Sequence, residues 1–479
     1  MKNSAENAWY FLAPIGISIA CGASGSLPET DDPSASFPHF DASISPSPTS
    51  SSPSTEGPEA PAGAIPIPKE AQRTNGDPAR GYRAVVNEGY ISLGIPWSGF
   101  SFAMTPLKAR DSIPGREGKN ALVGYANNVM TNRQGMELAV PNCLACHAAR
   151  LNGKLFVGLG NPAHLPAIPS GLATNQALVT IGLRTPSEFA EYQEYTSRIL
   201  AANSTGILFP FGALAAHRDP QTLAWSSIAR FDAHTNLQGW VDVPPWWRTK
   251  KKNGLYANGM GRGDHVGHMM NMSVFSVQDV AEAEHIETMF VDIAAYLRSI
   301  EPPKFPYDIN KELAAQGEKA FIHTCAPCHG TYGSNESYPN LLIPVEMVGT
   351  DPSLAENPWP NADAVAWFKS SYYGKRARLE PARGYVAPPL DGIWATAPFF
   401  HNGSVPTLEA VIDPSKRPSS WSMSFDETNF DPRAAGWSTA GGGPAYDTTQ
   451  PGLSNQGHKF GEALSSDERL AVLEYLKTL

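Results

Sequence analysis

Apolar residues recur at helical spacing in three segments of the chain, 279–300, 311–324 and 465–479. The first ends at a Glu-Pro-Pro sequence, which stops a helix because proline lacks a backbone N–H. The second runs directly into Cys325, and the third begins with the helix-capping sequence Ser-Ser-Asp-Glu. We therefore predict three amphipathic helices. Their apolar faces are formed by Ile286, Met289, Phe290, Ile293 and Leu297, by Leu313, Gly317, Phe321 and Ile322, and by Leu470, Leu473, Tyr475 and Leu476.

A shorter apolar run, 8–20 (AWYFLAPIGISIA), cannot span a bilayer but has the length of the apolar core of a signal peptide. The small residues around Cys21 resemble a bacterial lipoprotein signal, in which cleavage leaves a lipidated N-terminal cysteine. Ser18, where an aliphatic residue is usual, and a first segment whose only base is Lys2 depart from that pattern. We predict that 1–21 is a signal peptide of lipoprotein type. An ordinary secretory signal and a misplaced start codon are the alternatives.

Residues 22–66 are rich in Ser, Pro, Ala and Gly, and their only charged side chains are acidic. Such a stretch cannot bury enough apolar surface to fold, and its prolines stiffen it. We predict a disordered linker that holds the folded part away from a membrane to which Cys21 is anchored. A disordered leader with no tethering role is the alternative.

The composition of the whole chain limits its class and its partners. The remaining residues are enough for two domains with proper cores, which we place at 67–303 and 304–479. The net charge of −10 argues against nucleic acid as a partner. With 42 glycines, 43 prolines and only 17% charged residues, the sequence favours compact, loop-rich domains wrapped around cofactors.

Four of the five cysteines lie in two copies of Cys-x-x-Cys-His, Cys143 to His147 and Cys325 to His329. This spacing is the attachment sequence of c-type haem: two thiols add to the two vinyl groups of a porphyrin, and the histidine binds the iron. Cysteine is too sparse for a disulfide framework. Neither motif is followed by ligands at zinc-finger spacing, and a thioredoxin-like motif would not explain the histidine. We predict two covalently bound haems c, with His147 and His329 as proximal ligands.

Far more residues separate Cys143 from the helix predicted at 279–300 than a minimal cytochrome needs. This insertion either seals haem 1, attached at Cys143 and Cys146, or builds a pocket over it. It is rich in Phe and Trp, and its aromatic residues include Trp225, Trp240, Trp246 and Trp247. Such side chains can form the wall of an apolar pocket. The pair at 246 and 247 can relay oxidising equivalents, although aromatic clusters are more often simply core.

Several stretches resemble known haem proteins. The helix that delivers Cys325 and the C-terminal helix resemble the two crossing helices of a class I cytochrome c, in which a small residue such as Gly317 allows close approach. APFFHNGSVPTLEAVI (397–412) resembles a segment of bacterial dihaem cytochrome c peroxidases and of MauG. Four stretches, NCLACHAARLNGKLFVGLGN, PPWWRTKKKNGLY, PPLDGIWATAPFFHNGSVPTL and NQGHKFGEALSSDERLAVLEYLKTL, resemble the rubber-oxygenase branch. The similarity covers most of 85–479. It implies a mainly α fold of two class I cytochrome c-like domains, the first with a large loop-rich insertion.

The resemblance also implies roles for individual residues. His458 matches the position that supplies the distal ligand of haem 2, attached at Cys325 and Cys328, which would make that haem low-spin and bis-histidine. The alternative for His458 is a surface histidine just ahead of a helix. In the peroxidase branch, the histidine that matches His401 lies near the haem system without being an obvious axial ligand, so the resemblance implies that His401 lies beside the haem. Its alternative is a structural histidine in an Asn-Gly turn.

The sixth ligand of haem 1 decides the function, and the sequence leaves it open. The candidates are His164, His217, His234, His265, His268, Met260, Met269, Met270 and Met272. His265 and His268 share one face if their segment is helical. If no side chain binds, peroxide or dioxygen can coordinate there. Lys250, Lys251 and Lys252 can meet haem propionates, although a solvated basic turn is the default interpretation.

Three functions are compatible with the sequence. The first is an oxidoreductase that activates peroxide or dioxygen at haem 1 and exchanges electrons through haem 2. The second is a dihaem electron carrier without a catalytic site. The third is oxidative modification of a protein or polymer by long-range radical transfer. The large insertion favours the first or the third. We expect a periplasmic or cell-envelope location, with outer-membrane anchoring or secretion as variants. The expected partners are an electron donor or acceptor protein or a quinol pathway, and a small-molecule, polymer or protein substrate.

Overall fold

The computed structural model describes residues 58–104, 113–162, 176–203, 210–233, 241–356, 361–425 and 427–479, which belong to one compact unit, Glu56–Leu479. The predicted signal peptide with Cys21, the linker as far as residue 57, His164, His234 and Trp240 lie outside the described residues. In the part of the chain that is described, no helix is both long and apolar enough to cross a membrane.

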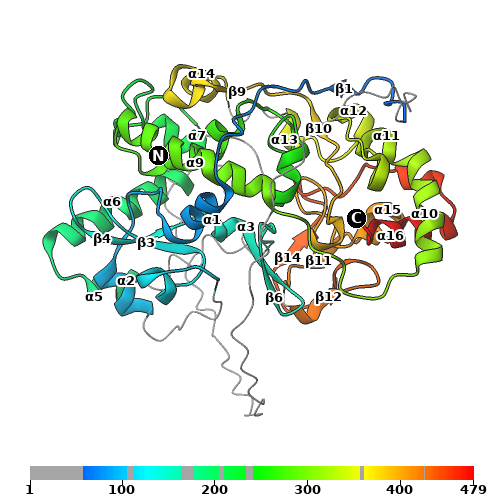
Figure 1. Cartoon of the computed structure of the whole chain (residues 1–479), viewed down its shortest axis with the longest axis horizontal. Coiled ribbons are helices and arrows are strands. Elements are labelled where there is room, and N and C mark those ends of the chain that lie inside the picture. Colours follow the sequence, from blue (N-terminus) through cyan, green and yellow to red (C-terminus); the bar gives the residue numbers. More distant parts are fainter. Residues whose placement is uncertain are drawn as a thin grey trace, which may run out of the picture. The chain divides into compact units, whose positions relative to one another are not determined.

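Two pairs of packed helices organise this unit (Figure 1). Helix α1 (Pro78–Asn87) packs on α9 (Val280–Ser299), and α10 (Lys311–Thr324) packs on α16 (Ser466–Leu476). Both contacts depend on glycine. A Cβ atom at Gly81 would lie 2.0 Å from the Asp292 carbonyl oxygen, and one at Gly317 would lie 1.9 Å from that of Ala471. The three predicted helices are therefore confirmed, and so is the close approach at Gly317. Ile322 and Leu470, which were predicted on apolar faces, are instead exposed.

The helix ends are fixed by local capping. Pro78 occupies the first turn of α1, and the Asp77 carboxylate accepts hydrogen bonds from two backbone N–H groups there. Asp279 caps α9 and Asn310 caps α10 in the same way. Ser465 and Glu468 form a capping box at α16, as the sequence predicted.

Small sheets accompany the helices, so the prediction of a mainly α fold is correct only in part. Strands β2 (Ile95–Pro96), β4 (Glu137–Pro141) and β3 (Asn127–Thr131) form one antiparallel sheet that leads into the first haem motif. A second sheet joins β1 (Ile65–Pro66), β8 (Leu341–Pro344) and β10 (Gly384–Val386). The predicted linker therefore stops short of residue 66. The remaining pairs are β5 (Ala148–Leu151) with β6 (Lys154–Val157), β7 (Gly261–Gly263) with β9 (Ala377–Leu379), β11 (Ser420–Ser422) with β14 (Ala445–Asp447), and β12 (Phe430–Asp431) with β13 (Gly436–Trp437).

The other described α-helices lie before the first motif, in the two motifs, in the insertion and in the second half of the chain. They are α2 (Trp97–Met104), α3 (Leu144–His147), α5 (Gln176–Gly182), α6 (Pro186–Asn203), α7 (Pro210–Ala216), α8 (His265–Met269), α11 (Ala326–His329), α12 (Val345–Val348), α13 (Ser353–Glu356), α14 (Ala362–Ser370) and α15 (Leu408–Ile412). A 3-10 helix, η2 (Trp246–Lys251), follows the Pro244-Pro245 sequence.

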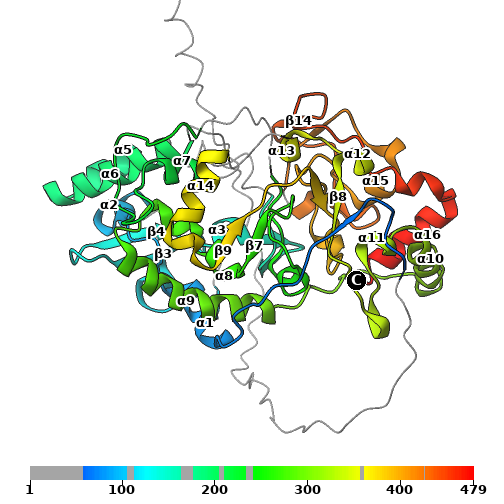
Figure 2. The ribbon, with the colours of Figure 1, turned by 90° about the horizontal axis from the view of Figure 1, so that it is seen from above.

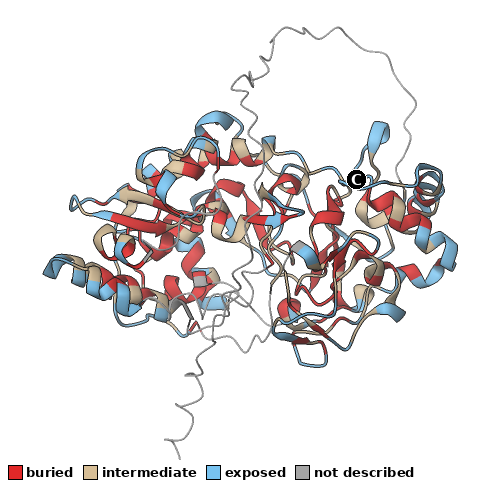
Figure 3. Ribbon diagram, turned by 90° about the horizontal axis from the view of Figure 1, so that it is seen from below, coloured by how far each residue is buried: buried red, intermediate tan, exposed pale blue. Residues whose placement is uncertain are grey.

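The two main apolar cores exchange segments across the predicted boundary at 303/304. Trp367, Phe368 and Tyr373 belong to the core of the first half, and β9 pairs with β7 there. In return, Leu151 and Trp247 belong to the core of the second half. Figure 3 shows the buried residues concentrated on the inner sides of the helices and strands, with exposed residues on the outer turns of α10.

An N-terminal segment, 65–77, crosses from one half to the other (Figure 2). It begins as β1 on β8, then Gln72 donates a hydrogen bond to Gly263 and accepts one from the backbone of His265. At its end, the backbone N–H of Asp77 donates to Asp292 of α9. This segment therefore holds both halves together.

Candidate functional site

The first Cys-x-x-Cys-His motif lies at the end of β4, in a turn held by Asn142. The Asn142 side chain accepts a hydrogen bond from the backbone of Leu144 (2.9 Å) and donates to the Tyr125 carbonyl (2.8 Å) and to Asn128 (2.9 Å). Asn142 is buried, so these bonds satisfy its polar atoms where no water can. The turn then continues as α3, which carries His147.

The imidazole of His147 has a defined tautomer. Its Nδ1 atom donates a hydrogen bond to the Pro244 carbonyl oxygen at 3.1 Å. The ring also stacks on Trp246, with 5.0 Å between ring centroids. A proton on Nδ1 places the lone pair on Nε2, the form that binds a metal ion.

The second motif repeats this arrangement in α11. The Nδ1 atom of His329 donates to the Pro388 carbonyl oxygen at 2.8 Å. The turn after it depends on Gly330 at φ 79°, where a Cβ atom would lie 1.9 Å from the Ser337 carbonyl oxygen. The Tyr332 hydroxyl donates to the His329 carbonyl oxygen at 3.0 Å. The histidines of both motifs are therefore oriented by the first carbonyl of a Pro-Pro sequence.

The two Pro-Pro segments are joined directly. The indole Nε1 of Trp247 donates a hydrogen bond to the Asp391 carbonyl oxygen at 2.8 Å. Trp247 is 1% exposed, and Trp246 beside it lies on the ring of His147. The segment that holds His147 through Pro244 is thus hydrogen-bonded to the segment that holds His329 through Pro388.

The cysteines lie in surroundings that suit thioethers. Burial raises the pKa of the Cys143 thiol to about 11 and those of Cys146 and Cys325 to about 12. Such surroundings disfavour the thiolate that zinc binding or nucleophilic catalysis needs, and they are compatible with uncharged thioether links. The described residues hold no group of three or more His, Cys, Asp or Glu side chains around a common metal position.

His458 faces His329 at a spacing that fits one iron between them. The ring centroids are 6.2 Å apart, with 58° between the ring planes. Two imidazoles that share a metal ion through bonds of roughly 2.0 Å have centroids roughly 6.3 Å apart. The residues present therefore fit a haem with two histidine ligands at the second motif.

The His458 ring lacks the hydrogen bonds expected of a structural histidine. Its Nδ1 atom is buried and has no hydrogen-bond partner within the described part of the chain. Burial, followed by the neighbouring His329 and Arg417, lowers its pKa to about 3, so the ring is neutral. A buried polar atom without a partner costs about 1–3 kcal/mol, and a metal bond on the same ring offsets that cost.

Arg417 holds the loop that presents His458. Its guanidinium donates to the carbonyl oxygens of Asn455 (2.9 Å), Gly457 (2.6 Å) and His458 (3.1 Å). It also donates to the carbonyls of α15 and lies over the ring of Phe400, 5.0 Å from its centroid. These bonds keep His458 in the left-handed backbone region, at φ 46°.

His401 is placed beside this centre and not at an axial position facing His329. Its ring stacks on Tyr385 at 3.9 Å between centroids, and burial lowers its pKa to about 4. The preceding residue, Phe400, contacts the His458 ring at 5.8 Å. His401 is therefore linked to this site only along the chain, through its neighbour Phe400, as far as the described contacts go.

The described histidines that are candidates for the sixth ligand of haem 1 differ in the hydrogen bonds of their rings. His268 uses both ring nitrogens: Nε2 donates to the Arg262 carbonyl (2.9 Å), and Nδ1 faces the Tyr256 hydroxyl (3.4 Å). His217 bonds Ser226 through Nδ1 and stacks on Trp225. His265 begins α8, as the sequence suggested, and its buried Nε2 has no hydrogen-bond partner in the described part.

The candidate methionines are embedded in protein. Met260 and Met270 are buried, and Met269 and Met272 are partly so. Met270 packs in the first core with Val266 of α8, and Met269 lies against the same core. Packing in the apolar core therefore accounts for the burial of these methionines.

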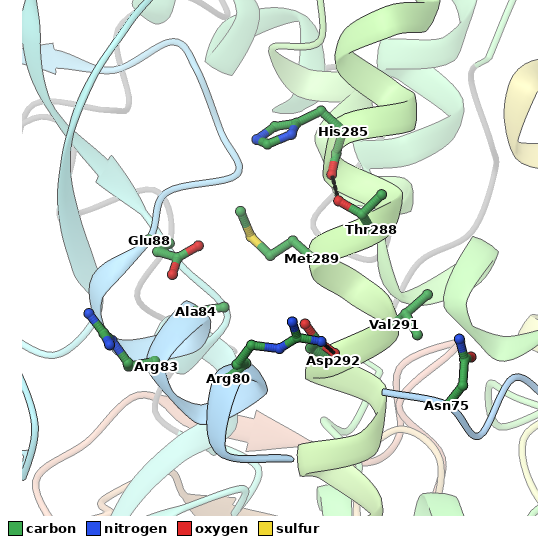
Figure 4. A pocket seen from close by; sticks show the side chains of 10 residues that line it. All are labelled: Asn75, Arg80, Arg83, Ala84, Glu88, His285, Thr288, Met289, Val291 and Asp292. Carbon is green, nitrogen blue, oxygen red and sulfur yellow. Dashed lines mark hydrogen bonds and ion pairs between the residues drawn. The ribbon is translucent and has the colours of Figure 1, made fainter. Parts of the chain in front are cut away.

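A surface pocket lies apart from both motifs, between α1 and α9 (Figure 4). Two of its charged groups, Arg80 and Asp292, form an ion pair at 3.0 Å. Met289 lies at its base, and neither the cysteine motifs nor His458 line it. It is lined by Asn75, Arg80, Arg83, Ala84, Glu88, His285, Thr288, Met289, Val291 and Asp292.

Sequence reasoning missed three functional elements: the carbonyls of Pro244 and Pro388, and the side chain of Arg417. The first two left a weak signal, because a Pro-Pro sequence follows each motif, at 244–245 and at 388–389, although a third Pro-Pro, at 302–303, holds neither histidine. Arg417 left none, since nothing in its neighbourhood along the chain marks it as a partner of 455–458.

Comparisons with known proteins agree with this chemistry. Residues 384–422 match a family described as "RoxA-like, cytochrome c-like". Two uncharacterised proteins of Sinorhizobium fredii are similar: y4iJ is 31% identical over 249 residues (38% of this chain, 41% of that protein), and y4iM is 28% identical over 202 residues (35% and 45%). The chain thus spans less than half the length of these relatives.

A solved structure of Kuenenia stuttgartiensis hydrazine synthase, pressurised with xenon, matches 60% of this chain and 92% of its own at 14% identity. Its TM-score of 0.24 is too low to indicate a shared fold. Residues 384–422 are thus similar to a RoxA-like, cytochrome c-like domain, and a domain of that kind, together with the Cys-x-x-Cys-His motifs, implies covalently bound haem c.

Proposed function

We propose that this chain is an exported dihaem oxidoreductase. Haem 1 would be attached at Cys143 and Cys146 and react with peroxide or dioxygen. Haem 2 would be attached at Cys325 and Cys328 and carry electrons. The observation that supports this division most directly is the pair His329 and His458, with ring centroids 6.2 Å apart.

Two histidines on one iron leave it no position for a substrate. Such a haem exchanges electrons without binding small molecules. When bound, haem c supplies a redox-active iron that can also coordinate peroxide or dioxygen where a position is open. Substrate chemistry then falls to the haem carried by His147. The long segment between β5 and α9, which packs in the same core as Leu144 of α3, is suited to shaping that site.

The chain also offers a route for electrons between the two sites. Trp246 stacks on His147, and Trp247 bonds the Asp391 carbonyl beside the backing of His329. An indole between two redox centres can pass single electrons. We propose that this pair couples haem 1 to haem 2.

A second candidate function is a dihaem electron carrier without a catalytic site. The observation that favours it is the buried Nε2 of His265, which has no partner in the described residues and can serve as an iron ligand. In that case both haems would be six-coordinate.

The location and partners form part of the same proposal. Export would bring the chain to the compartment where c-type haem is attached, and a lipid on Cys21 would hold it at the cell envelope. An electron donor or acceptor protein, or a quinol pathway, would exchange electrons with haem 2. The similarity to rubber oxygenases makes an apolar polymer one substrate class to test, beside small molecules and proteins.

Electron paramagnetic resonance (EPR) and visible spectra of the oxidised, half-reduced and reduced protein test the proposal. A high-spin ferric component, or an adduct with dioxygen or peroxide on one haem, supports it. Two low-spin haems that ignore peroxide, dioxygen and carbon monoxide in every redox state support the carrier instead. His265→Ala distinguishes the two: it opens a site only if His265 is a ligand.

His458→Met should change the haem 2 signal while leaving that of haem 1 in place. His147→Ala should abolish peroxide or dioxygen chemistry while the low-spin signal of haem 2 remains. A low-spin signal unchanged by His458→Met would show that the assignment of the distal ligand is wrong.

A further inference from the structure

Tyr90 lies in the loop between α1 and β2, and its hydroxyl reaches the first haem motif. The hydroxyl oxygen lies 3.7 Å from the Sγ atom of Cys143, and this is the one hydrogen bond of that hydroxyl among the described residues. The ring of Tyr90 packs edge-on against Phe290 of α9, with 5.0 Å between ring centroids. Phe290 belongs to the first apolar core, and both Tyr90 and Cys143 pack against that core. Tyr90 therefore joins the motif to the long helix that follows the insertion.

The backbone on both sides of Tyr90 is fixed. A Cβ atom at Gly89 would lie 2.7 Å from the sulfur of Met130, so this segment lies directly on the sheet that leads into the motif. On the other side, the backbone N–H of Ser92 donates to the Ser276 hydroxyl at 2.8 Å, in a buried position. The side chain of Tyr90 therefore has little freedom to turn away from the motif.

The direction of the hydrogen bond between Tyr90 and Cys143 depends on what the sulfur carries. A free thiol can donate its hydrogen to the tyrosine oxygen. A thioether sulfur has no hydrogen and can only accept, so the Tyr90 hydroxyl must then be the donor. Desolvation raises the pKa of Tyr90 well above its usual value, so the hydroxyl keeps the proton that it would donate. This arrangement therefore suits a sulfur that is linked to haem.

The second motif has no counterpart of this bond. Cys325 lies against the second apolar core, and Cys328 lies against the small apolar cluster of Leu341, Ile343 and Ala387. In the part of the chain that the structure describes, no side chain forms a hydrogen bond with either of these two sulfurs. A hydroxyl beside a cysteine sulfur therefore distinguishes the first motif from the second.

We propose that Tyr90 is a positioning residue of haem 1, whose hydroxyl donates a hydrogen bond to the Cys143 thioether sulfur and raises the reduction potential of that haem. This rests on the proposed covalent haem at the first motif. The positive end of the hydroxyl dipole faces the linked edge of the porphyrin, and it stabilises the reduced state, which carries one more electron. Hydrogen bonding around a haem is one means by which a protein sets its potential. The bond therefore favours electron transfer from haem 2 towards haem 1.

The test compares Tyr90→Phe with Tyr82→Phe. Each substitution removes one hydroxyl from a tyrosine that packs edge-on against an aromatic ring of α9, which for Tyr82 is Tyr296 at 5.2 Å. The Tyr82 hydroxyl, however, donates to the Pro114 carbonyl oxygen and not to a cysteine. Peptide mass spectrometry first measures haem content and the site of attachment. Each haem is then titrated at controlled potentials and followed by EPR and visible spectroscopy, and His458→Met identifies the signal of haem 2.

We expect the reduction potential of haem 1 to fall in Tyr90→Phe and to keep its wild-type value in Tyr82→Phe, with haem 2 unchanged in both. Equal potentials of haem 1 in the two variants would overturn the inference, and so would an equal fall at both haems. A wild-type chain without haem at Cys143 would contradict the proposed function as well. A chain with both haems and no change in Tyr90→Phe contradicts this inference alone. Should Tyr90→Phe not fold, Tyr90→Met gives the same comparison, because methionine fills the space against Phe290 and has no donor.

Discussion

Replacing Arg417 by methionine should loosen His458, the residue that we propose as the distal ligand of haem 2. Methionine keeps much of the apolar stem and removes all hydrogen-bond donors. The guanidinium donates to three carbonyls of the loop 455–458, those of Asn455, Gly457 and His458. The variant leaves these oxygens without their charged donor.

The size of the effect follows from these bonds. A hydrogen bond to a charged group contributes about 1.5–3 kcal/mol, and the three share one donor, so their sum is less than three independent terms. We estimate a loss of about 3–5 kcal/mol. In addition, His458 has a left-handed backbone at φ 46°, which costs about 1–2 kcal/mol and is released when the loop relaxes. Since about 1.4 kcal/mol changes an equilibrium tenfold, a visible fraction of molecules should lose the histidine ligand.

The assay is the ratio of high-spin to low-spin ferric signal of haem 2, measured by EPR and by visible spectroscopy over a range of temperatures. Lys416→Met is the matched control, because that neighbouring side chain forms its one ion pair among the described residues with Glu409 and takes no part in holding the loop 455–458. The high-spin fraction should rise in Arg417→Met and grow on warming. If Arg417→Met keeps the same fully low-spin signal as Lys416→Met, the loop is held by other contacts and the reasoning fails.

Two further predictions concern stability. Gly317→Ala should destabilise the protein by about 3 kcal/mol or more, because its Cβ atom would lie 1.9 Å from the Ala471 carbonyl oxygen. The control is Gly124→Ala, whose Cβ atom would meet nothing within 4 Å and which should unfold in denaturant like the wild type. Equal unfolding midpoints for the two variants would contradict the close helix packing. His268 is kept neutral by burial, which lowers its pKa to about 4 from 6.5. The unfolded chain therefore binds a proton at this residue first, and the free energy of unfolding falls by up to about 3 kcal/mol as the pH drops from 6.5 towards 4. His268→Gln should weaken this pH dependence in urea titrations, and an unchanged dependence would show that His268 is not the group responsible.

Features encoded over a few residues could be predicted from the sequence. The capping box at Ser465 and the helix that runs into Cys325 are local patterns, and both are present. The Cys-x-x-Cys-His motifs are local too. The orientation of each histidine was not predictable, because it depends on a backbone carbonyl far along the chain, at Pro244 or Pro388.

Long-range pairing explains the rest of what sequence reasoning missed. Helix α1 was not predicted. Its close contact with α9 depends on Gly81 lying against the backbone of Asp292, which is far away in the sequence. The strands are two to five residues long, too short for a periodic signal, and most gain their partners from distant segments. His458 was found only through a resemblance, since a single histidine before a helix carries no pattern of its own.

The N-terminal segment 65–77 has a consequence for how the protein is made. Glu70 pairs with Arg378, which is 308 residues further along the chain, and Ile65 pairs with Leu342. During synthesis Glu70 and Ile65 emerge long before their partners, so these contacts cannot both form until Arg378 has been made. Folding that waits for such distant contacts is slow. If haem is attached at the two cysteine motifs as proposed, both motifs would stay accessible for longer before the chain closes over them.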